Sequence, residues 1–190
     1  MTPAPPVKVT LTRRESDLKQ ILKLQAANLR EAVGEDTARE QGFVTAKHDL
    51  PLLRAMTEAA ASVIARQGRR VVGYALAMTR AFGDSVPVLR ELFERQDVCT
   101  YGGQRLGEVN YLVMGQVCVA EEARGKRLVD RMYKYMRGCY ALHYPYLITA
   151  IVASNTRSRR VHERIGFEVL QEFTGRDGRE WILVIWDWRE

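Results

Sequence analysis

A basic turn near the middle of the chain, Arg124-Gly125-Lys126-Arg127, combines three cations with one glycine. It follows the short apolar run Val117–Val119, which indicates a strand. The apolar side chains after the turn recur at helical spacing and predict one buried helix face, formed by Leu128, Met132, Tyr135 and Met136. The first amides of a helix lack internal acceptors and lie at the positive end of its dipole, so this strand–turn–helix segment can hold a phosphate.

A second segment, Asn155–Phe167, has the pattern of a short capped helix. Asn155 is a favourable N-cap residue, and Gly166 suits the C-terminal end. Asn155, Ser158 and His162 are spaced i, i+3 and i+7, so they share one helix face. The segment is also basic, which suits a phosphate-rich ligand; its cations are Arg157, Arg159, Arg160 and Arg164.

The two segments together resemble the signature motifs of the GCN5-related N-acetyltransferase (GNAT) superfamily. The first motif is Val-x-x-x-x-Arg-Gly-x-Gly-x-Gly/Ala, and the matching residues are Val119, Arg124 and Gly125. The second is Asn-x-x-Ala-x-x-x-Tyr-Glu-Lys-x-Gly-Phe, and the matching residues are Asn155, Glu163, Arg164, Gly166 and Phe167, with Ser158 at the small position and His162 at the tyrosine position. The chain departs from the first motif at two positions that are usually small, Arg127 and Val129.

This resemblance implies acetyl transfer from acetyl-CoA to an amine, with no nucleophilic cysteine or serine and no metal. It implies that the backbone of Val117, Cys118 and Val119 holds the pantetheine arm and that one strand amide polarises the thioester carbonyl. The turn would surround the diphosphate with Arg124, Gly125, Lys126, Arg127, Leu128 and Val129. Asn155 and Ser158 would contact the cofactor from the second helix, although a simple helix cap is the alternative role for Asn155.

His162 stands where the family usually has a tyrosine that protonates the departing CoA thiolate, so we expect it to be the general acid. An ordinary histidine pKa of about 6.5 leaves part of the side chain protonated near neutrality, and a histidine packed in the core is the alternative. Gln116 replaces a glutamate found in some family members, and we assign no base; Glu31, Glu108 and a water relay are all open. For the acceptor pocket we expect Phe43, Thr45, Tyr111 and Gln116.

A sheet has to position these segments, and we expect one domain over residues 1–190 with a disordered lead at 1–6. Apolar runs predict strands at 7–12, 61–66, 71–78, 117–119, 146–152, 167–170 and 181–186, and the last is apolar on both faces, so it should lie inside the sheet. Helical spacing predicts helices at about 15–30 and 49–60 and an inserted helix around 84–95, besides the two described above. The order of elements predicts a single-domain α/β fold similar to that of the GNAT family, with a mixed central sheet of about seven strands and helices on both faces.

The composition points to a soluble protein, with 46% hydrophobic and 27% charged residues and a net charge of +6. No apolar run approaches the ~20 residues that span a membrane, and the N-terminus does not have the pattern of a signal peptide, so we expect a cytoplasmic protein. The three cysteines are far apart and form neither a disulfide framework nor a zinc motif.

Two other functions stay open at this stage. A CoA-binding or regulatory module without turnover is favoured by Arg127, Val129 and the missing glutamate. A basic nucleic-acid-binding protein is compatible with the net charge but less favoured, because no aromatic platform or nucleic-acid motif accompanies the cations. The expected partner is a small-molecule or peptide amine acceptor; the oligomeric state is open, and a homodimer is one alternative.

Overall fold

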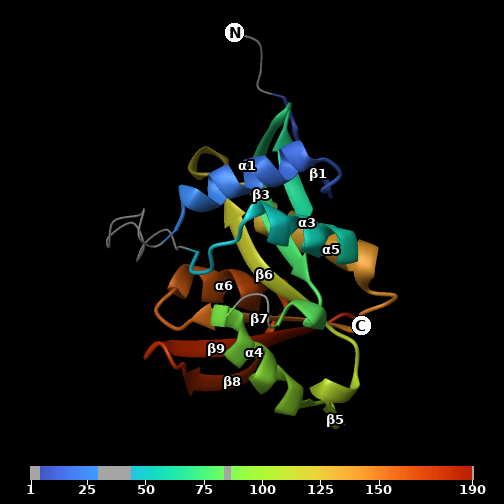
Figure 1. The fold of residues 1–190 in the computed structure, drawn as a ribbon, viewed down its shortest axis with the longest axis vertical. Helices are drawn as coiled ribbons and strands as arrows, with labels where there is room; N and C mark the ends of the chain where they lie inside the picture. Colours follow the sequence, from blue (N-terminus) through green and yellow to red (C-terminus); the bar gives the residue numbers. More distant parts are fainter. Residues whose placement is uncertain (1–4, 30–43, 84–86, 190) are drawn as a thin grey trace.

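The computed structural model describes residues 5–29, 44–83 and 87–189, and a seven-stranded mixed sheet forms its centre (Figure 1). The strand order is β1-β2-β3-β6-β7-β9-β8. The strands are β1 (Val7–Leu11), β2 (Val63–Gln67), β3 (Arg70–Met78), β6 (Leu112–Val119), β7 (Tyr146–Val152), β8 (Glu168–Thr174) and β9 (Glu180–Asp187). Among these seven strands, β6 and β7 are the only neighbours that pair in parallel. The last strand, β9, lies between β7 and β8, which confirms its predicted place inside the sheet.

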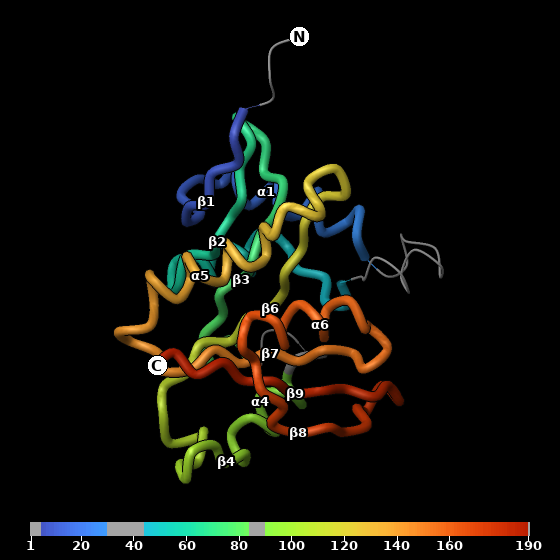
Figure 2. The backbone as a smooth tube through the Cα atoms, turned by 180° about the vertical axis from the view of Figure 1, so that it is seen from behind, coloured from blue at the N-terminus to red at the C-terminus, as the bar shows by residue number. Residues whose placement is uncertain are grey.

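Helices cover both faces of the sheet, as predicted (Figures 1 and 2). On one face lie α1 (Glu15–Ala26) and α3 (Leu50–Ala59), and their buried apolar residues are Leu18, Ile21, Leu53 and Met56. Asp49 caps α3 by accepting a hydrogen bond of 2.9 Å from the amide of Leu52. None of the helices among the described residues is long and apolar enough to cross a membrane.

The opposite face carries α5 (Leu128–Tyr140) and α6 (Thr156–Ile165). The buried face of α5 consists of Leu128, Met132, Tyr133 and Met136. The prediction that Tyr135 belongs to this face is wrong, because Tyr135 lies on the flank of the helix and is 37% exposed. Its place in the core is taken by Tyr133, which is fully buried.

The segment between β3 and β6 contains the predicted inserted helix, α4 (Pro87–Val98); residues 84–86 lie outside the described part of the chain. It also contains a small hairpin, β4 (Thr100–Tyr101) with β5 (Gln104–Arg105), and short 3-10 turns on either side. Helix α4 contacts the outer strand β8 and the turn that follows it. The guanidinium of Arg95 lies 4.1 Å from the ring centre of Phe173, and Arg176 forms an ion pair of 3.0 Å with Glu94.

Strands β6 and β7 separate soon after they pair. Their only ladder pairs are Leu112 with Leu147 and Val113 with Ile148. At the next residue, the hydroxyl of Thr149 donates to the carbonyl oxygen of Met114 at 2.8 Å, in place of a backbone bond. The pairing of β6 with β3 shifts register at Gly115, and such a bulge bends the strand. From Gly115 to Val119, β6 therefore runs apart from β7 and leaves one backbone edge without a strand partner.

Of the predicted lead, residues 1–4 lie outside the described part of the chain. Pro5 and Pro6 are exposed coil, and the carbonyl oxygen of Pro5 accepts a hydrogen bond of 3.0 Å from the side chain of Gln67.

Candidate functional site

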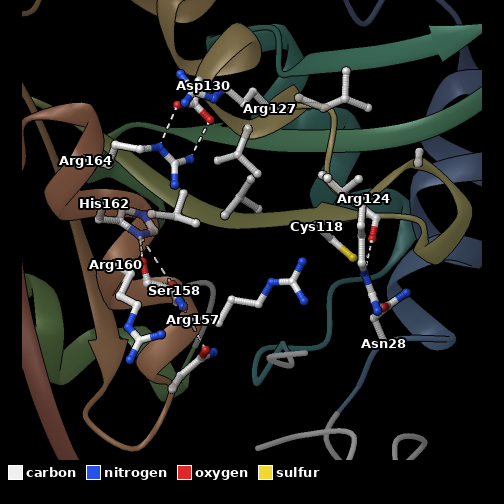
Figure 3. A pocket seen from close by; sticks show the side chains of 18 of the residues that line it. Asn28, Cys118, Arg124, Arg127, Asp130, Arg157, Ser158, Arg160, His162 and Arg164 are labelled. Carbon is white, nitrogen blue, oxygen red and sulfur yellow. Dashed lines mark hydrogen bonds and ion pairs between the residues drawn. The ribbon is translucent and has the colours of Figure 1, made fainter. Parts of the chain in front are cut away.

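A cavity of about 720 Å³ lies where β6 and β7 separate. Its walls are β6, the basic turn with the start of α5, and most of α6 (Figure 3). Asn28 and Val44 also line it. All but one of the residues predicted to bind the cofactor line it, namely Val117, Cys118, Val119, Arg124, Gly125, Arg127, Leu128, Val129, Asn155 and Ser158. The exception is Lys126, which is exposed but does not line the cavity.

The basic turn has an unusual backbone. Gly125 has φ +77° and Arg127 has φ +50°, and Arg127 is the only described non-glycine residue with positive φ. Helix α5 begins directly after it, and no side chain caps the helix. The amides of Leu128 and Val129 therefore have no intrahelical acceptor and lie in the cavity wall. This is the arrangement in which a helix N-terminus binds a phosphate.

The side chain of Arg124 forms structural hydrogen bonds to two other parts of the chain. Its Nε donates to the carbonyl oxygen of Val119 at 3.2 Å, and its terminal nitrogen donates to Oδ1 of Asn28 at 2.9 Å. The side chain thus joins the end of β6 to the residues that follow α1. Sequence reasoning missed the contact, because Asn28 precedes Arg124 by 96 residues and carries no local signal.

Asn155 caps α6, and its side-chain oxygen accepts a hydrogen bond of 3.1 Å from the amide of Ser158. The simple capping role that the sequence offered as an alternative is therefore present, although Asn155 also lines the cavity. Arg157 and Arg160 line the cavity from the same helix and are exposed. The basic composition of this segment indicated them, but the motif comparison did not select them.

Asp130 is the one carboxylate among the described residues that line the cavity. Arg164 binds both of its oxygens, at 3.1 and 2.8 Å. Burial raises the pKa of Asp130, but the hydrogen bonds from Arg164, a backbone hydrogen bond and the charges of Arg164 and Arg127 together lower the pKa overall. The carboxylate is therefore ionised and fully paired, which reduces its repulsion of an anionic ligand.

The structure places His162 in surroundings that the sequence did not indicate. The ring lines the cavity but is buried, and both of its nitrogens are engaged. Nε2 lies 2.7 Å from the hydroxyl of Tyr133, and Nδ1 lies 2.8 Å from the carbonyl oxygen of Ser158. Burial lowers the pKa of His162 to about 4, so the ring is neutral near pH 7 and has no free proton to donate. Sequence reasoning assumed an ordinary pKa and could not see Tyr133 beside the ring.

Of the residues predicted for the acceptor pocket, the three that the structure describes, Thr45, Tyr111 and Gln116, do not line this cavity. Phe43 lies outside the described residues, as does Glu31. Thr45 is half-buried, and Tyr111 is buried with its hydroxyl donating to Asp97 at 2.8 Å. Gln116 is buried beneath segment 44–49: its amide accepts from the Tyr74 hydroxyl at 2.5 Å and donates to the carbonyl oxygen of Ala46 at 2.6 Å. The structure therefore gives Tyr111 and Gln116 structural partners.

A family comparison identifies this arrangement. The model of the acetyltransferase (GNAT) family matches residues 20–167, while a comparison with curated proteins finds no match. Among solved structures, the N-acetyltransferase from Staphylococcus aureus Mu50 has a TM-score of 0.63 at 13% identity, covering 97% of this chain and 99% of that one.

Two further structures share the fold. The protein yncA from Salmonella typhimurium, solved with its cofactor acetyl-CoA, has a TM-score of 0.61 at 15% identity and covers 97% of this chain and 95% of its own. The ribosomal-protein-S18-alanine N-acetyltransferase from Escherichia coli has a TM-score of 0.61 at 11% identity, with coverage of 96% and 94%. At these identities the likeness shows the fold alone.

Proposed function

The chain belongs to the acetyltransferase (GNAT) family, and from that premise we propose that it transfers an acetyl group from acetyl-CoA directly to a primary amine of a small molecule or peptide. The observation that carries the proposal is the separation of β6 from β7 beside a cavity with a phosphate-binding turn. A long ligand with a polar amide-containing arm at one end and phosphates at the other matches these two features.

The residues present fit CoA. The unpaired backbone edge of β6 from Gly115 to Val119 can exchange hydrogen bonds with the amides of the pantetheine arm. The free amides at the start of α5 and the charge of Arg127 suit the diphosphate. When bound, acetyl-CoA supplies a thioester whose carbonyl carbon an amine can attack, and an amide of β6 would hold the carbonyl oxygen.

Direct transfer is supported by the state of Cys118, the one cysteine among the described residues that line the cavity. Burial raises the pKa of this thiol to about 12, and the nearby Arg124 only partly opposes the effect. The thiol stays protonated at neutral pH, and a protonated thiol is a poor nucleophile. An acetyl group would therefore pass to the amine without an acetyl-cysteine stage, and positioning of the two substrates would supply much of the rate.

A CoA-binding module without turnover is the second candidate. It is favoured by two observations: the amide of Gln116 replaces a carboxylate and is fully used by Tyr74 and Ala46, and His162 is neutral and engaged. A nucleic-acid-binding role is less well supported, because Arg127, Arg157 and Arg160 line a cavity and do not form an open basic surface.

Two measurements separate these functions. Isothermal titration with CoA tests binding, and release of free thiol from acetyl-CoA across a panel of amines and peptides with free N-termini tests turnover. Binding with amine-dependent thiol release supports the enzyme, and binding without it supports the module. Failure to bind CoA contradicts both, and salt-sensitive binding of RNA or DNA by the same protein would then support the nucleic-acid function.

A further inference from the structure

The cavity has more cationic groups than its own structure uses. Arg164 is held by Asp130, and Arg124 is held by Asn28 and the end of β6. Arg157 and Arg160 differ from these two, since no hydrogen bond or ion pair joins either guanidinium to another residue in the described part of the chain. Two exposed arginines on one cavity wall, with no partner in the described part of the chain, are available to neutralise an anionic ligand.

The position of the pair is as informative as its charge. Arg157 and Arg160 lie at i and i+3 of α6, so they project from the same side of the helix. Figure 3 shows the side chain of Arg157 extending from α6 into the cavity. The phosphate-binding turn belongs to a different element, at the start of α5. The cavity therefore offers two separate places for phosphate, one made of backbone amides with Arg127 and one made of side chains.

CoA carries its phosphates in two groups, the diphosphate and the 3′-phosphate of the ribose. We propose that Arg157 and Arg160 bind the 3′-phosphate, so that the protein discriminates CoA from dephospho-CoA. This inference rests on the proposed function, because it presupposes that CoA occupies the cavity with its diphosphate at the α5 turn. A dianionic phosphate between two guanidiniums accepts charge-assisted hydrogen bonds from both, which a ribose hydroxyl cannot replace.

The test compares the affinities of CoA and dephospho-CoA by isothermal titration. For the wild-type protein we expect CoA to bind on the order of ten-fold more tightly or better, as charge-assisted hydrogen bonds imply. In the double variant Arg157→Ala/Arg160→Ala, CoA affinity should fall to the level of dephospho-CoA, whose own affinity should change little. Arg127→Ala should weaken both ligands by the same factor, because it acts on the diphosphate.

Arg159→Ala is the matched control, since Arg159 is on the same helix but does not line the cavity, and it should preserve the discrimination. Thermal unfolding of each variant checks that it is folded. If the double variant weakens CoA and dephospho-CoA equally, the two arginines contact the diphosphate and the proposal is overturned. Equal affinities of the wild-type protein for both ligands overturn it while leaving the proposed function intact. If CoA does not bind at all, both fail.

Discussion

The hydroxyl of Tyr133 lies 2.7 Å from Nε2 of His162, and both side chains are buried. Nδ1 of the same ring lies 2.8 Å from the carbonyl oxygen of Ser158, so the neutral ring donates through Nδ1 and accepts through Nε2. Phe167 packs edge-to-face against both rings. The helix position at which the family usually has a tyrosine therefore carries one half of a buried tyrosine–histidine pair.

The pair should behave as one structural unit. Tyr133→Phe leaves Nε2 without a donor, and His162→Phe leaves a buried hydroxyl without an acceptor, so each should lower the free energy of unfolding by about 1–3 kcal/mol. The double variant removes both partners and should lose less than the sum of the two, by about 1 kcal/mol. Urea unfolding of the four proteins measures the interaction, and strictly additive losses would contradict it.

The single variant His162→Phe also distinguishes a structural role of the tyrosine–histidine pair from general acid catalysis by His162. Once an acceptor is known, the alkaline limb of the profile of kcat against pH should be the same in wild type and His162→Phe, because a group with a pKa of about 4 is already deprotonated there. An alkaline limb near pH 6.5 that is present in wild type and absent in His162→Phe would show that His162 acts as the general acid.

Acidification should destabilise the protein between pH 6.5 and 4. Burial lowers the pKa of both His162 and His48 to about 4, against the opposing effects of the Ser158 carbonyl on His162 and of the Asp49 charge on His48, whereas unfolded histidine has a pKa of about 6.5. Between these values the unfolded state binds more protons, so stability is lost as the pH falls, by up to about 1.4 kcal/mol per pH unit for each histidine. Urea unfolding from pH 7.5 to 4.5 measures this slope.

A matched pair of variants assigns the acid effect to its source. His162→Phe should flatten the slope by the share of one histidine, whereas replacement of the exposed His143 by Asn should leave it unchanged. A slope that is the same in His162→Phe and wild type would mean that His162 titrates normally in the folded protein.

Gly125→Glu should abolish or strongly weaken CoA binding. Gly125 has φ +77° and space beside its Cα, so a glutamate side chain would enter the cavity where the diphosphate is expected. Gly178 has φ +73°, equally open surroundings and a place in the turn between β8 and β9, so Gly178→Glu has the same backbone strain without the charge effect. Isothermal titration should show loss of CoA affinity only in Gly125→Glu. Equal CoA affinity in both variants would show that the diphosphate does not bind at this turn.

Arg127→Gly should change stability and binding in opposite directions. Arg127 holds a left-handed backbone, φ +50°, where the family motif has glycine, so the substitution relieves strain and should raise the free energy of unfolding by up to about 1 kcal/mol. Loss of the exposed charge should weaken CoA binding by up to about five-fold at low salt. Arg127→Lys keeps both charge and strain and is the control. Tighter binding in Arg127→Gly would show that the arginine obstructs the site.

Local patterns in the sequence predicted most of the fold and one wall of the site. The run 181–186, apolar on both faces, predicted β9 inside the sheet, the Asp49 cap predicted the start of α3, and the turn with Gly125 predicted the start of α5. Each of these features depends on residues close together in the chain, where spacing and residue type carry the information.

Features that depend on distant partners escaped prediction. The ring of His162 is paired with the hydroxyl of Tyr133, 29 residues earlier, and the side chain of Gln116 is held by the carbonyl oxygen of Ala46, 70 residues earlier. Neither pairing has a local signal. The motif identified His162 and Gln116 as positions of interest, but their chemistry follows from burial and from hydrogen-bond partners that only the folded chain supplies.

Gln116→Glu should not create a catalytic base. The side chain of Gln116 accepts from Tyr74 and donates to the carbonyl oxygen of Ala46, so it fastens segment 44–49 to the centre of β6. A carboxylate can still accept from Tyr74 but has no proton for Ala46, and its charge would lie in a buried site against a carbonyl oxygen. We expect a loss of about 1–3 kcal/mol in the free energy of unfolding and no increase in acetyl transfer to any acceptor.

Gln104→Glu, on the exposed β4–β5 hairpin, is the control and should leave stability within about 0.5 kcal/mol of wild type. A Gln116→Glu variant that is as stable as wild type, with amine-dependent thiol release raised above it, would show instead that the side chain reaches the acceptor and that only its missing charge limits catalysis.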